Sequence, residues 1–283
     1  MLASDRSPRR ESRRAVRKHL AALIALTCAA CVGRPAGAAR WTAETLGMEF
    51  VRLSAGTFLM GSPTDEAGRE TQEVQHEVVL SNDFYLATTE VTQAQWTAVM
   101  GVNPSRFADC PNCPVEEVSA IDIDRFIARI GAEEGVDFRL PTEAEWEYAC
   151  RGGRTTPFGG GSELTTDEAN FDGNYPLAGS PTGQFRERTT PVATFAPNDF
   201  GLFDMSGNVW EWTSDQHCEY PAASITDPNG VCGTELRVIR GGSWLFGADS
   251  ARCALRYTHR PGDVGPSLGL RLARDVQGQR GEG

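Results

Sequence analysis

Apolar side chains recur at helical spacing in three segments of the chain, 92–101, 119–130 and 142–152. The first and third segments open with a Thr-x-x-Gln or Thr-x-x-Glu capping box, and the second opens at Ser119. The first and third end at glycine, which commonly closes a helix. The spacing therefore predicts three helices, each with one buried face.

The remaining regular segments are short runs typical of strands. Between 152 and 197 there is little periodicity, and we expect an ordered loop that needs cross-links or bound ions to hold it. The whole pattern predicts an α+β protein with much irregular structure. The expected strands are 50–53, 57–60, 77–80, 84–88, 236–239, 251–257 and 268–273.

Residues 1–38 have the pattern of a secretory signal peptide. A basic segment, 6–18, precedes an apolar run, 20–32, and small residues then offer a cleavage site after Ala38 or Ala39. The apolar run is too short to span a bilayer comfortably. We therefore expect no transmembrane segment after signal cleavage.

Export implies a periplasmic or extracellular location, and its route stays open. Residues 12–18 resemble a twin-arginine signal, and an ordinary arginine-rich signal fits equally well. A lipid anchor on Cys28 or Cys31 is an alternative. The length of the mature chain suits a single domain over 39–276, followed by a disordered tail, 277–283.

Charge and composition exclude several partners and reactions. The chain has a net charge of −11, and removal of the signal takes away eight basic and two acidic residues, which leaves −17. A nucleic acid is not expected as a partner, because it requires a basic footprint. Lys18 is the only lysine, so the mature chain has none for Schiff-base, pyridoxal phosphate or P-loop chemistry.

Six of the eight cysteines lie beyond the signal. An even number in an exported chain predicts three disulfides, for which six cysteines allow 15 pairings. Cys110 and Cys113 form a CxxC without the βαβ setting of a thioredoxin, so a local loop staple is favoured over a redox motif. Cys218 and Cys232 flank a loop that contains Gly and Pro, and they most simply staple it.

Seven sequence blocks follow one another along the mature chain. They include the long segments RLPTEAEWEYACRGG and GLFDMSGNVWEW and the short segment RGGSW. The blocks are 56–62, 90–92, 103–105, 139–153, 201–212, 240–244 and 269–271.

In this order the blocks resemble the formylglycine-generating-enzyme family, also called sulfatase-modifying factors, over roughly 41–274. The resemblance implies a single C-type-lectin-like domain with low regular secondary structure. It also implies a disulfide between Cys150 and Cys253, in addition to the two local staples expected above.

The resemblance further implies bound calcium, a hard cation that prefers oxygen ligands. The first implied site consists of Asp204, Gly207, Val209 and Glu211, with backbone oxygens from the middle two. The second site uses Asn170 and Phe171. Its further carboxylate falls near Gly183, and Asp172 is a candidate substitute.

The family's copper chemistry has no matching residues in this sequence. The resemblance implies two cysteines shortly after the Gly-Gly-Ser-aromatic motif, because thiolates suit Cu(I). Here Phe246 stands at the first of these positions, the segment is shorter, and no cysteine precedes Cys253. Copper is therefore not expected, and we do not expect formylglycine synthesis by the known mechanism.

Two other branches of the family were compared with the chain. Ergothioneine-type sulfoxide synthases hold iron with histidines from an extra helical domain that has no counterpart here. The mature histidines, His76, His217 and His259, are widely spaced, so iron is not indicated. A pyoverdine-maturation protein of the family is likewise an exported single domain.

Several residues come from blocks that line the family pocket, although tryptophan is more often a core residue. Arg252 and Arg256 alternate along an expected strand and are predicted to share a face. Glutamates 143, 145 and 147 are expected on the surface of their helix and in its capping box. The pocket candidates are Trp210, Arg240, Ser243, Trp244, Arg256 and His259.

Two functions from different classes remain open. One is an exported oxidoreductase-like enzyme that acts on a peptide or a siderophore-type product, with His259 as a candidate catalytic group. The other is a non-catalytic module that holds a peptide or glycan in the lectin-like cleft. Oxidation of a cysteine in a sulfatase-like peptide is a distant third. Fold alone does not decide between them.

Overall fold

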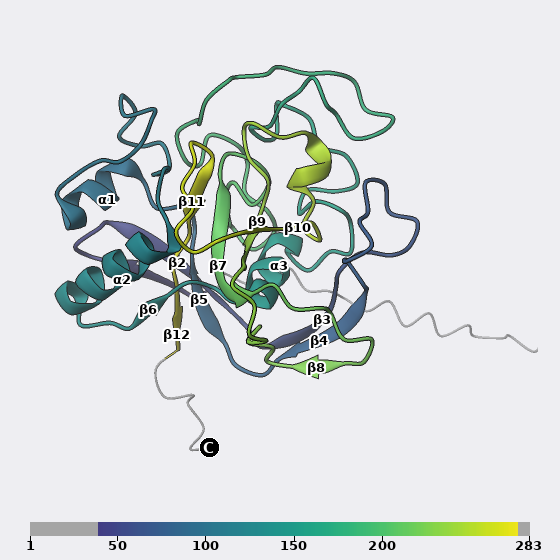
Figure 1. The fold of residues 1–283 in the computed structure, drawn as a ribbon, viewed down its shortest axis with the longest axis horizontal. Coiled ribbons are helices and arrows are strands. Elements are labelled where there is room, and N and C mark those ends of the chain that lie inside the picture. Colours follow the sequence, from purple (N-terminus) through teal and green to yellow (C-terminus); the bar gives the residue numbers. More distant parts are fainter. Residues whose placement is uncertain (1–38, 277–283) are drawn as a thin grey trace, which may run out of the picture. The chain divides into compact units, whose positions relative to one another are not determined.

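The computed structural model describes residues 39–276, the coloured part of the ribbon in Figure 1. The predicted signal peptide, 1–38, with Cys28 and Cys31, and the predicted tail, 277–283, lie outside the described residues. Three α-helices and twelve short strands in three sheets make up the regular structure of 39–276, which confirms the α+β class. Within the same residues, no helix is both long and apolar enough to cross a membrane.

The largest sheet has five antiparallel strands. Phe50 and Val51 follow one another on its second strand, so they point to opposite faces, and both are fully buried, each in its own core cluster. The strand order is β1 (Arg40–Ala43), β2 (Met48–Leu53), β5 (Phe84–Ala87), β12 (Ala273–Asp275) and β6 (Phe138–Arg139).

The three predicted helices are present, and each begins with a capping box and ends at a glycine with positive φ. The rings of Trp96 and Phe126 stack 4.8 Å apart and join the first two helices in the core cluster that includes Phe50. The helices are α1 (Gln93–Met100), α2 (Ala120–Glu134) and α3 (Glu143–Arg151).

A four-stranded sheet carries most of the candidate residues. Its last strand is parallel to its neighbour, and the other pairs are antiparallel. Helix α3 packs against this sheet, as Figure 1 shows. The order is β10 (Arg256–His259), β9 (Arg237–Arg240), β7 (Trp210–Gln216) and β11 (Leu268–Leu270).

A third, small sheet forms where the loop after β7 returns to an N-terminal hairpin. The hairpin strands are antiparallel, and the third strand adds to the edge in parallel. The order is β3 (Gly56–Met60), β4 (His76–Leu80) and β8 (Ile225–Thr226).

The strand predicted over 251–257 is wrong in most of its length. A 3₁₀ helix, η1 (Ala248–Ala251), and a turn precede β10. The turn lets the buried guanidinium of Arg252 reach Glu73 and Glu66 at 2.7 Å, away from Arg256. The two arginines therefore do not share a strand face. Arg252 lies in the turn and is fixed there by ion pairs with residues distant in sequence, so the spacing of the two arginines along the chain did not predict their arrangement.

The long loop after α3 contains neither helix nor strand up to β7, as predicted. It has an apolar cluster of its own, in which Phe158, Leu164 and Phe171 are buried with Leu177 and with Ala248 of η1. Burial of apolar surface thus contributes to ordering this loop, in addition to any cross-link or ion.

The three predicted disulfides are all present. Their Cα–Cα distances are 5.3 Å for Cys110–Cys113, 5.6 Å for Cys150–Cys253 and 5.9 Å for Cys218–Cys232. The second bridge closes 103 residues, so in the chain-entropy account it stabilises the fold by about 4 to 5 kcal/mol.

Candidate functional site

The four-stranded sheet divides the predicted pocket residues between its two faces. Its register pairs Trp212 with Ile239 and Ile239 with Tyr257, so these side chains share one face. Arg240 pairs with both Arg256 and Glu211, and these three share the other face, against α3. Arg240 and Arg256 therefore lie apart from the tryptophans with which the sequence grouped them.

Buried ion pairs fill the space between the sheet and α3. Arg256 donates to both carboxylate oxygens of Glu143, at 2.9 and 2.6 Å. Arg240 is paired with Glu147, which also accepts from Arg151 at 2.6 Å. The glutamates of α3 that were expected on its surface are thus buried, because arginines distant in sequence supply their counter-charges. Only the capping role of the helix was predicted correctly.

An aromatic group lies on the opposite face of the sheet. The ring of Trp210 contacts Phe246 and Tyr257, with centroids 5.6 and 5.8 Å apart. Phe246 is 38% exposed and Tyr257 51% exposed. Leu245, next to Phe246 in the chain, and Tyr175, whose carbonyl accepts from the Ala248 N–H at 2.9 Å, are exposed as well. We call Tyr175, Leu245, Phe246 and Tyr257 the aromatic face. Phe246 stands at the position where the resemblance implies a copper-binding cysteine.

The other candidates lie outside the charged face of the sheet, and only His259 adjoins the aromatic face. Trp244 is buried, donates from Nε1 to the Pro266 carbonyl at 2.9 Å and stacks against Phe185. Ser243 is buried as well. His259 is half-buried, contacts the rings of Trp212 and Tyr257, and lies 3.2 Å from Asp263. Of the predicted pocket residues on this side, His259 is the most exposed and borders the aromatic face.

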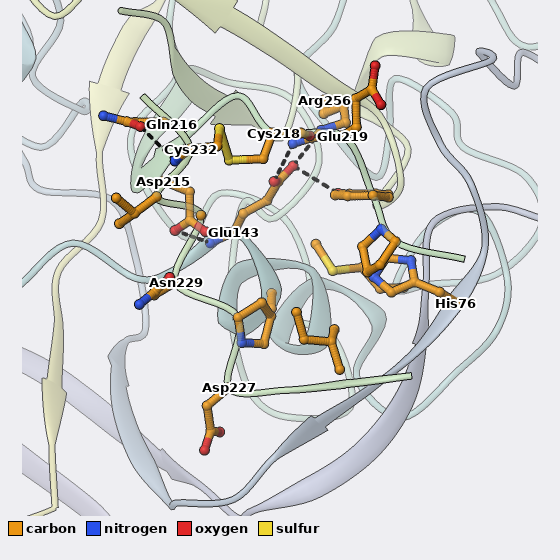
Figure 2. A pocket seen from close by; sticks show the side chains of 18 of the residues that line it. His76, Glu143, Asp215, Gln216, Cys218, Glu219, Asp227, Asn229, Cys232 and Arg256 are labelled. Carbon is orange, nitrogen blue, oxygen red and sulfur yellow. Dashed lines mark hydrogen bonds and ion pairs between the residues drawn. A yellow bond between two sulfur atoms is a disulfide. The ribbon is translucent and has the colours of Figure 1, made fainter. Parts of the chain in front are cut away.

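A cavity of about 370 Å³ opens at the far end of β7, and Figure 2 shows it from close by. Its walls come from the start of α3, the end of β7, the hairpin of β3 and β4, and the loop closed by Cys218–Cys232. The predicted candidate Arg256 lines it. The volume lies in the range of about 300 to 1,000 Å³ that is typical of small-molecule sites.

Glu143 is the centre of the charged wall of this cavity. Its Oε1 accepts hydrogen bonds from Tyr220 Oη and from Arg256 Nε, both at 2.9 Å. The guanidinium of Arg256 lies 4.0 Å from the ring centroid of Tyr220 and donates to the Cys218 carbonyl at 2.7 Å. The disulfide-closed loop is therefore held to α3 through Arg256.

Asp215 lies beneath the same loop and is 3% exposed. Its Oδ2 accepts from the backbone N–H of Glu143 at 2.9 Å, in the first turn of α3, and from Ser214 Oγ at 3.0 Å. Burial raises the pKa of Asp215 to about 7, and the negative charge of Glu143 adds to the rise. This carboxyl can change its protonation state near neutral pH.

Residues of this cavity were mostly missed in the sequence. His76 opens β4, whereas Asp215 and Tyr220 come from the end of β7 and the loop after it, and none lies in a motif of recognised chemistry. One usable signal was present. A loop stapled by Cys218 and Cys232 is held in place, and such a loop can form the wall of a cavity.

The first predicted calcium site contains a carboxylate that is already paired. Glu211 accepts from Arg271 at 2.7 and 3.0 Å and from Trp146 Nε1 at 2.7 Å. Asp204 accepts from the Ala193 N–H at 2.7 Å. A calcium ion at Glu211 would have to displace a guanidinium, so this set of residues does not fit the ion in the present arrangement.

Asp204 and Glu211 belong to a buried acidic group that also includes Glu90. Burial raises the pKa of Asp204 to about 6. It raises the pKa of Glu90 well above its ordinary range, and the charges of Asp204 and Glu211 add to this. Arg271 is the cation that faces all three.

The second predicted calcium site has an oxygen that lacks a partner. Asn170 is 1% exposed, and its Nδ2 donates to the Arg188 carbonyl at 3.0 Å. Its Oδ1 is buried and has no hydrogen-bond partner among residues 39–276. Gly183 packs against Thr166 and offers no carboxylate, whereas Asp172 follows Phe171 directly.

Comparisons with known proteins place this geometry in context. The chain is 31% identical over 259 residues to the serine/threonine-protein kinase pkn1 of Chlamydia caviae, which covers 83% of this chain and 39% of that protein. It is 32% identical over 242 residues to the formylglycine-generating enzyme of Streptomyces coelicolor, a match that covers 80% of this chain and 75% of that protein. The chain spans half or less of the length of the first relatives it matches.

A solved structure supports the same assignment. PvdO from Pseudomonas aeruginosa superposes with a TM-score of 0.71 at 29% identity, over 84% of this chain and 98% of that one. This likeness confirms the expected lectin-like α+β fold with few helices. The family model described as a sulfatase-modifying factor enzyme 1-like domain matches residues 37–276. The chain belongs to the sulfatase-modifying factor family, which includes the formylglycine-generating enzymes.

Proposed function

We propose that this protein is an exported, non-catalytic binding module of its family, which holds an apolar peptide segment on the aromatic face. The observation that carries the proposal is Phe246. A partly exposed aromatic ring stands where the resemblance places a metal-binding thiolate, and it contacts Trp210 and extends the apolar surface.

The cysteines support the non-catalytic part. All six cysteines within 39–276 are paired in disulfides. A disulfide sulfur is not a thiolate, and Cu(I) binds thiolates. Cys253, which is close in sequence to Phe246, is bonded to Cys150 and fully buried. An oxidase of the family type would need a ligand set that this face does not offer.

The chemistry of the aromatic face favours a peptide. Leu245, which is 44% exposed, directly precedes Phe246, and Tyr175, which is 68% exposed, has its backbone against Gly247 and Ala248, so exposed aliphatic and aromatic residues gather around this segment. Large exposed apolar patches mark interaction sites more often than chance surface. The acidic balance of the mature chain adds attraction for peptides that carry basic residues.

The enzyme hypothesis rests on family membership and on His259, which lies at the edge of the aromatic face. The imidazole is paired with Asp263 and contacts the rings of Trp212 and Tyr257, whereas the buried carboxylates of Glu143 and Glu211 lie on the other face of the sheet. General acid–base work needs an acid or base aimed at a reacting atom. The binding module is therefore the better-supported reading.

Export is part of the proposal, with a periplasmic or extracellular location. Three disulfides support it, since such bonds persist in oxidising compartments. The signal pattern of residues 1–38 supports it as well.

Calcium also enters the proposal, at the second predicted site. Asn170 Oδ1 and the Phe171 carbonyl would hold it, with Asp172 as the available carboxylate. The support is the buried, partnerless oxygen of Asn170. The ion would supply a structural link within the long loop, since hard oxygen ligands suit it.

The test is a selection of random peptides displayed on phage against the mature protein. Enriched peptides are then titrated into wild type and into Phe246→Ser by calorimetry. We expect at least tenfold weaker binding to the variant, because its apolar contact is lost. Leu59→Ser is the matched control: Leu59 is 45% exposed on β3, outside the aromatic face, and its loss should leave binding unchanged.

Two results would contradict the proposal. If no peptide is enriched, or if Leu59→Ser weakens binding as much as Phe246→Ser, the aromatic face is not the binding surface. If a bound cysteine-containing peptide changes mass on incubation with Cu(I) and dioxygen, the module is catalytic after all.

A further inference from the structure

The cavity at the end of β7 is separate from the aromatic face. Trp210, which anchors the aromatic face, is the first residue of β7, and Asp215 is near its end. A strand rises by about 3.3 Å per residue, which puts these two positions about 16 Å apart. A ligand in the cavity and a peptide on the aromatic face would therefore occupy different sites.

The inward polar groups of the cavity are acceptors. Asp215 Oδ1 has no hydrogen-bond partner among the described residues, whereas Oδ2 is held by α3 and Ser214. His76 is 5% exposed and its Nδ1 bonds to the Val74 carbonyl at 2.9 Å. Since that carbonyl only accepts, Nδ1 carries a proton, and in the neutral imidazole this leaves Nε2 as an acceptor. Figure 2 shows Asp215 and His76 on two sides of the cavity.

The guanidinium and the phenol that line the cavity already have partners. Arg256 directs Nε and Nη2 to Glu143 and Nη1 to the Cys218 carbonyl. The Tyr220 hydroxyl donates to Glu143. An anionic ligand would therefore find no free cationic donor here. Glu219 and Asp227 add negative charge at the exposed rim.

Much of the remaining wall is apolar. It includes Met60 of β3 and Ile225 of β8, which belong to the same small sheet, and it continues along the disulfide-closed loop. An aliphatic chain can bury its surface against such walls. The other apolar wall residues are Ala144, Pro221, Pro228 and Val231.

We propose that this cavity binds a primary ammonium group on a short aliphatic chain, with Asp215 as its counter-ion. The chain would lie along Ile225 and Met60 toward His76. The source is a free aliphatic amine or a lysine side chain of a partner. The mature chain has no lysine of its own to occupy the site.

The experiment titrates the mature protein by calorimetry with cadaverine and, separately, with Nα-acetyl-lysine methylamide. We expect saturable binding of one molecule, and amide NMR shifts that are confined to the cavity-lining residues, including the loop from Cys218 to Cys232. Tighter binding of cadaverine identifies a free amine as the ligand, and tighter binding of the lysine derivative identifies a protein side chain. Pentanol, which has the chain without the charge, should not bind.

The variant that tests the counter-ion is Asp215→Asn, which keeps an oxygen for the α3 N–H. We expect at least tenfold weaker binding of the amine. Asp199→Asn removes the same charge near the opposite end of α3, where Asp199 is exposed and its backbone lies close to Gly152, and should bind as wild type does. The NMR map of the wild-type protein needs no variant, so misfolding of one variant cannot hide the answer.

The proposal is overturned by any of three outcomes. These are a failure of both amines to bind saturably, binding of pentanol as tight as that of the amine, and weakening by Asp199→Asn as large as that by Asp215→Asn. Equal weakening by the two variants would mean that the net negative charge of the whole protein, and not Asp215, attracts the amine.

Discussion

At the residue scale, the interior contains four buried arginines that pair with buried carboxylates. Arg240, Arg252, Arg256 and Arg271 are all 1% exposed or less, and each meets at least one buried carboxylate. Such pairs add little net stability compared with apolar packing, yet breaking one is costly because a charge is left buried and uncompensated.

Arg271 provides a test of this cost, because it is the cation that faces Glu211, Glu90 and Asp204. We expect Arg271→Met to lose about 3 to 5 kcal/mol of unfolding free energy at pH 7. The loss should shrink at pH 5, where the acids left behind take up protons. Urea denaturation at both pH values measures it. Arg154→Met, which breaks the exposed pair with Asp199, should cost less than about 1 kcal/mol. Equal costs for the two variants would contradict the argument.

Asp215 should make stability depend on pH. Its pKa is about 7 in the folded protein and near 3.8 in an unfolded chain, so the folded state holds the proton over that interval. The contribution of Asp215 is therefore fully present below pH 4 and falls as pH rises toward 7, by up to about 1.4 kcal/mol per pH unit. Asp215→Asn should flatten this slope in denaturation curves recorded from pH 4 to 8. An unchanged slope would show that the carboxyl is ionised throughout.

The residues show what the sequence could predict. Motif order was sufficient for the family and for the Cys150–Cys253 bridge, whereas local spacing predicted the other two bridges and the helix caps. Local patterns placed Glu143 and Glu147 on the surface, because their partners Arg256 and Arg240 lie about a hundred residues away. Asp215 was missed for the same reason. Its burial depends on a loop that comes close to it only in the folded protein.

At the element scale, β7 illustrates why alternation failed. It was not among the predicted strands, because its polar positions Glu211, Thr213 and Asp215 are buried like its tryptophans. A strand that is covered on both faces loses the apolar–polar alternation that reveals half-buried strands. The polar side chains of this face can be buried because arginines and the first turn of α3 supply their partners.

Removal of the Cys218–Cys232 disulfide should loosen only the loop that it closes and the adjoining strand. Replacing both cysteines by serine should cost about 3 kcal/mol, since the bridge closes 14 residues. Hydrogen exchange measured by mass spectrometry should increase in the peptides that cover this loop and β8. The aromatic face should keep its protection. Faster exchange throughout the domain would mean that the loop supports the whole fold.

At the scale of the whole molecule, regular structure is sparse. No helix or strand occurs between the end of α3 and the start of β7, so the long loop depends on its small apolar cluster and on backbone bonds such as Asn208 N–H to the Asn170 carbonyl, at 2.8 Å. The α+β class and this loop were both predictable, because composition and periodicity report them directly. The sheet order was not, since it is set by contacts distant in sequence.

The calcium proposal is tested at this scale. A chelator should lower the thermal midpoint of the mature protein by several degrees, and added Ca²⁺ should restore it, because a ligand that binds only the folded state stabilises it. In Asn170→Ala the midpoint should no longer respond to either reagent. Glu66→Gln, at a carboxylate paired with Arg252, is the control that should retain the response. A wild-type midpoint that ignores the chelator would exclude the site.

The connectivity of the three disulfides has a consequence for biosynthesis. The Cys218–Cys232 bridge is nested inside the span closed by Cys150–Cys253. If an oxidase joined cysteines in the order in which they emerge from a translocon, Cys150 would be bonded to Cys218. The native disulfides form only if Cys150 stays reduced until Cys253 is available, or if an isomerase rearranges the wrong Cys150–Cys218 bond. A host that lacks disulfide isomerase should therefore yield scrambled protein, whereas a chain that folds before oxidation would already hold Cys150 beside its partner.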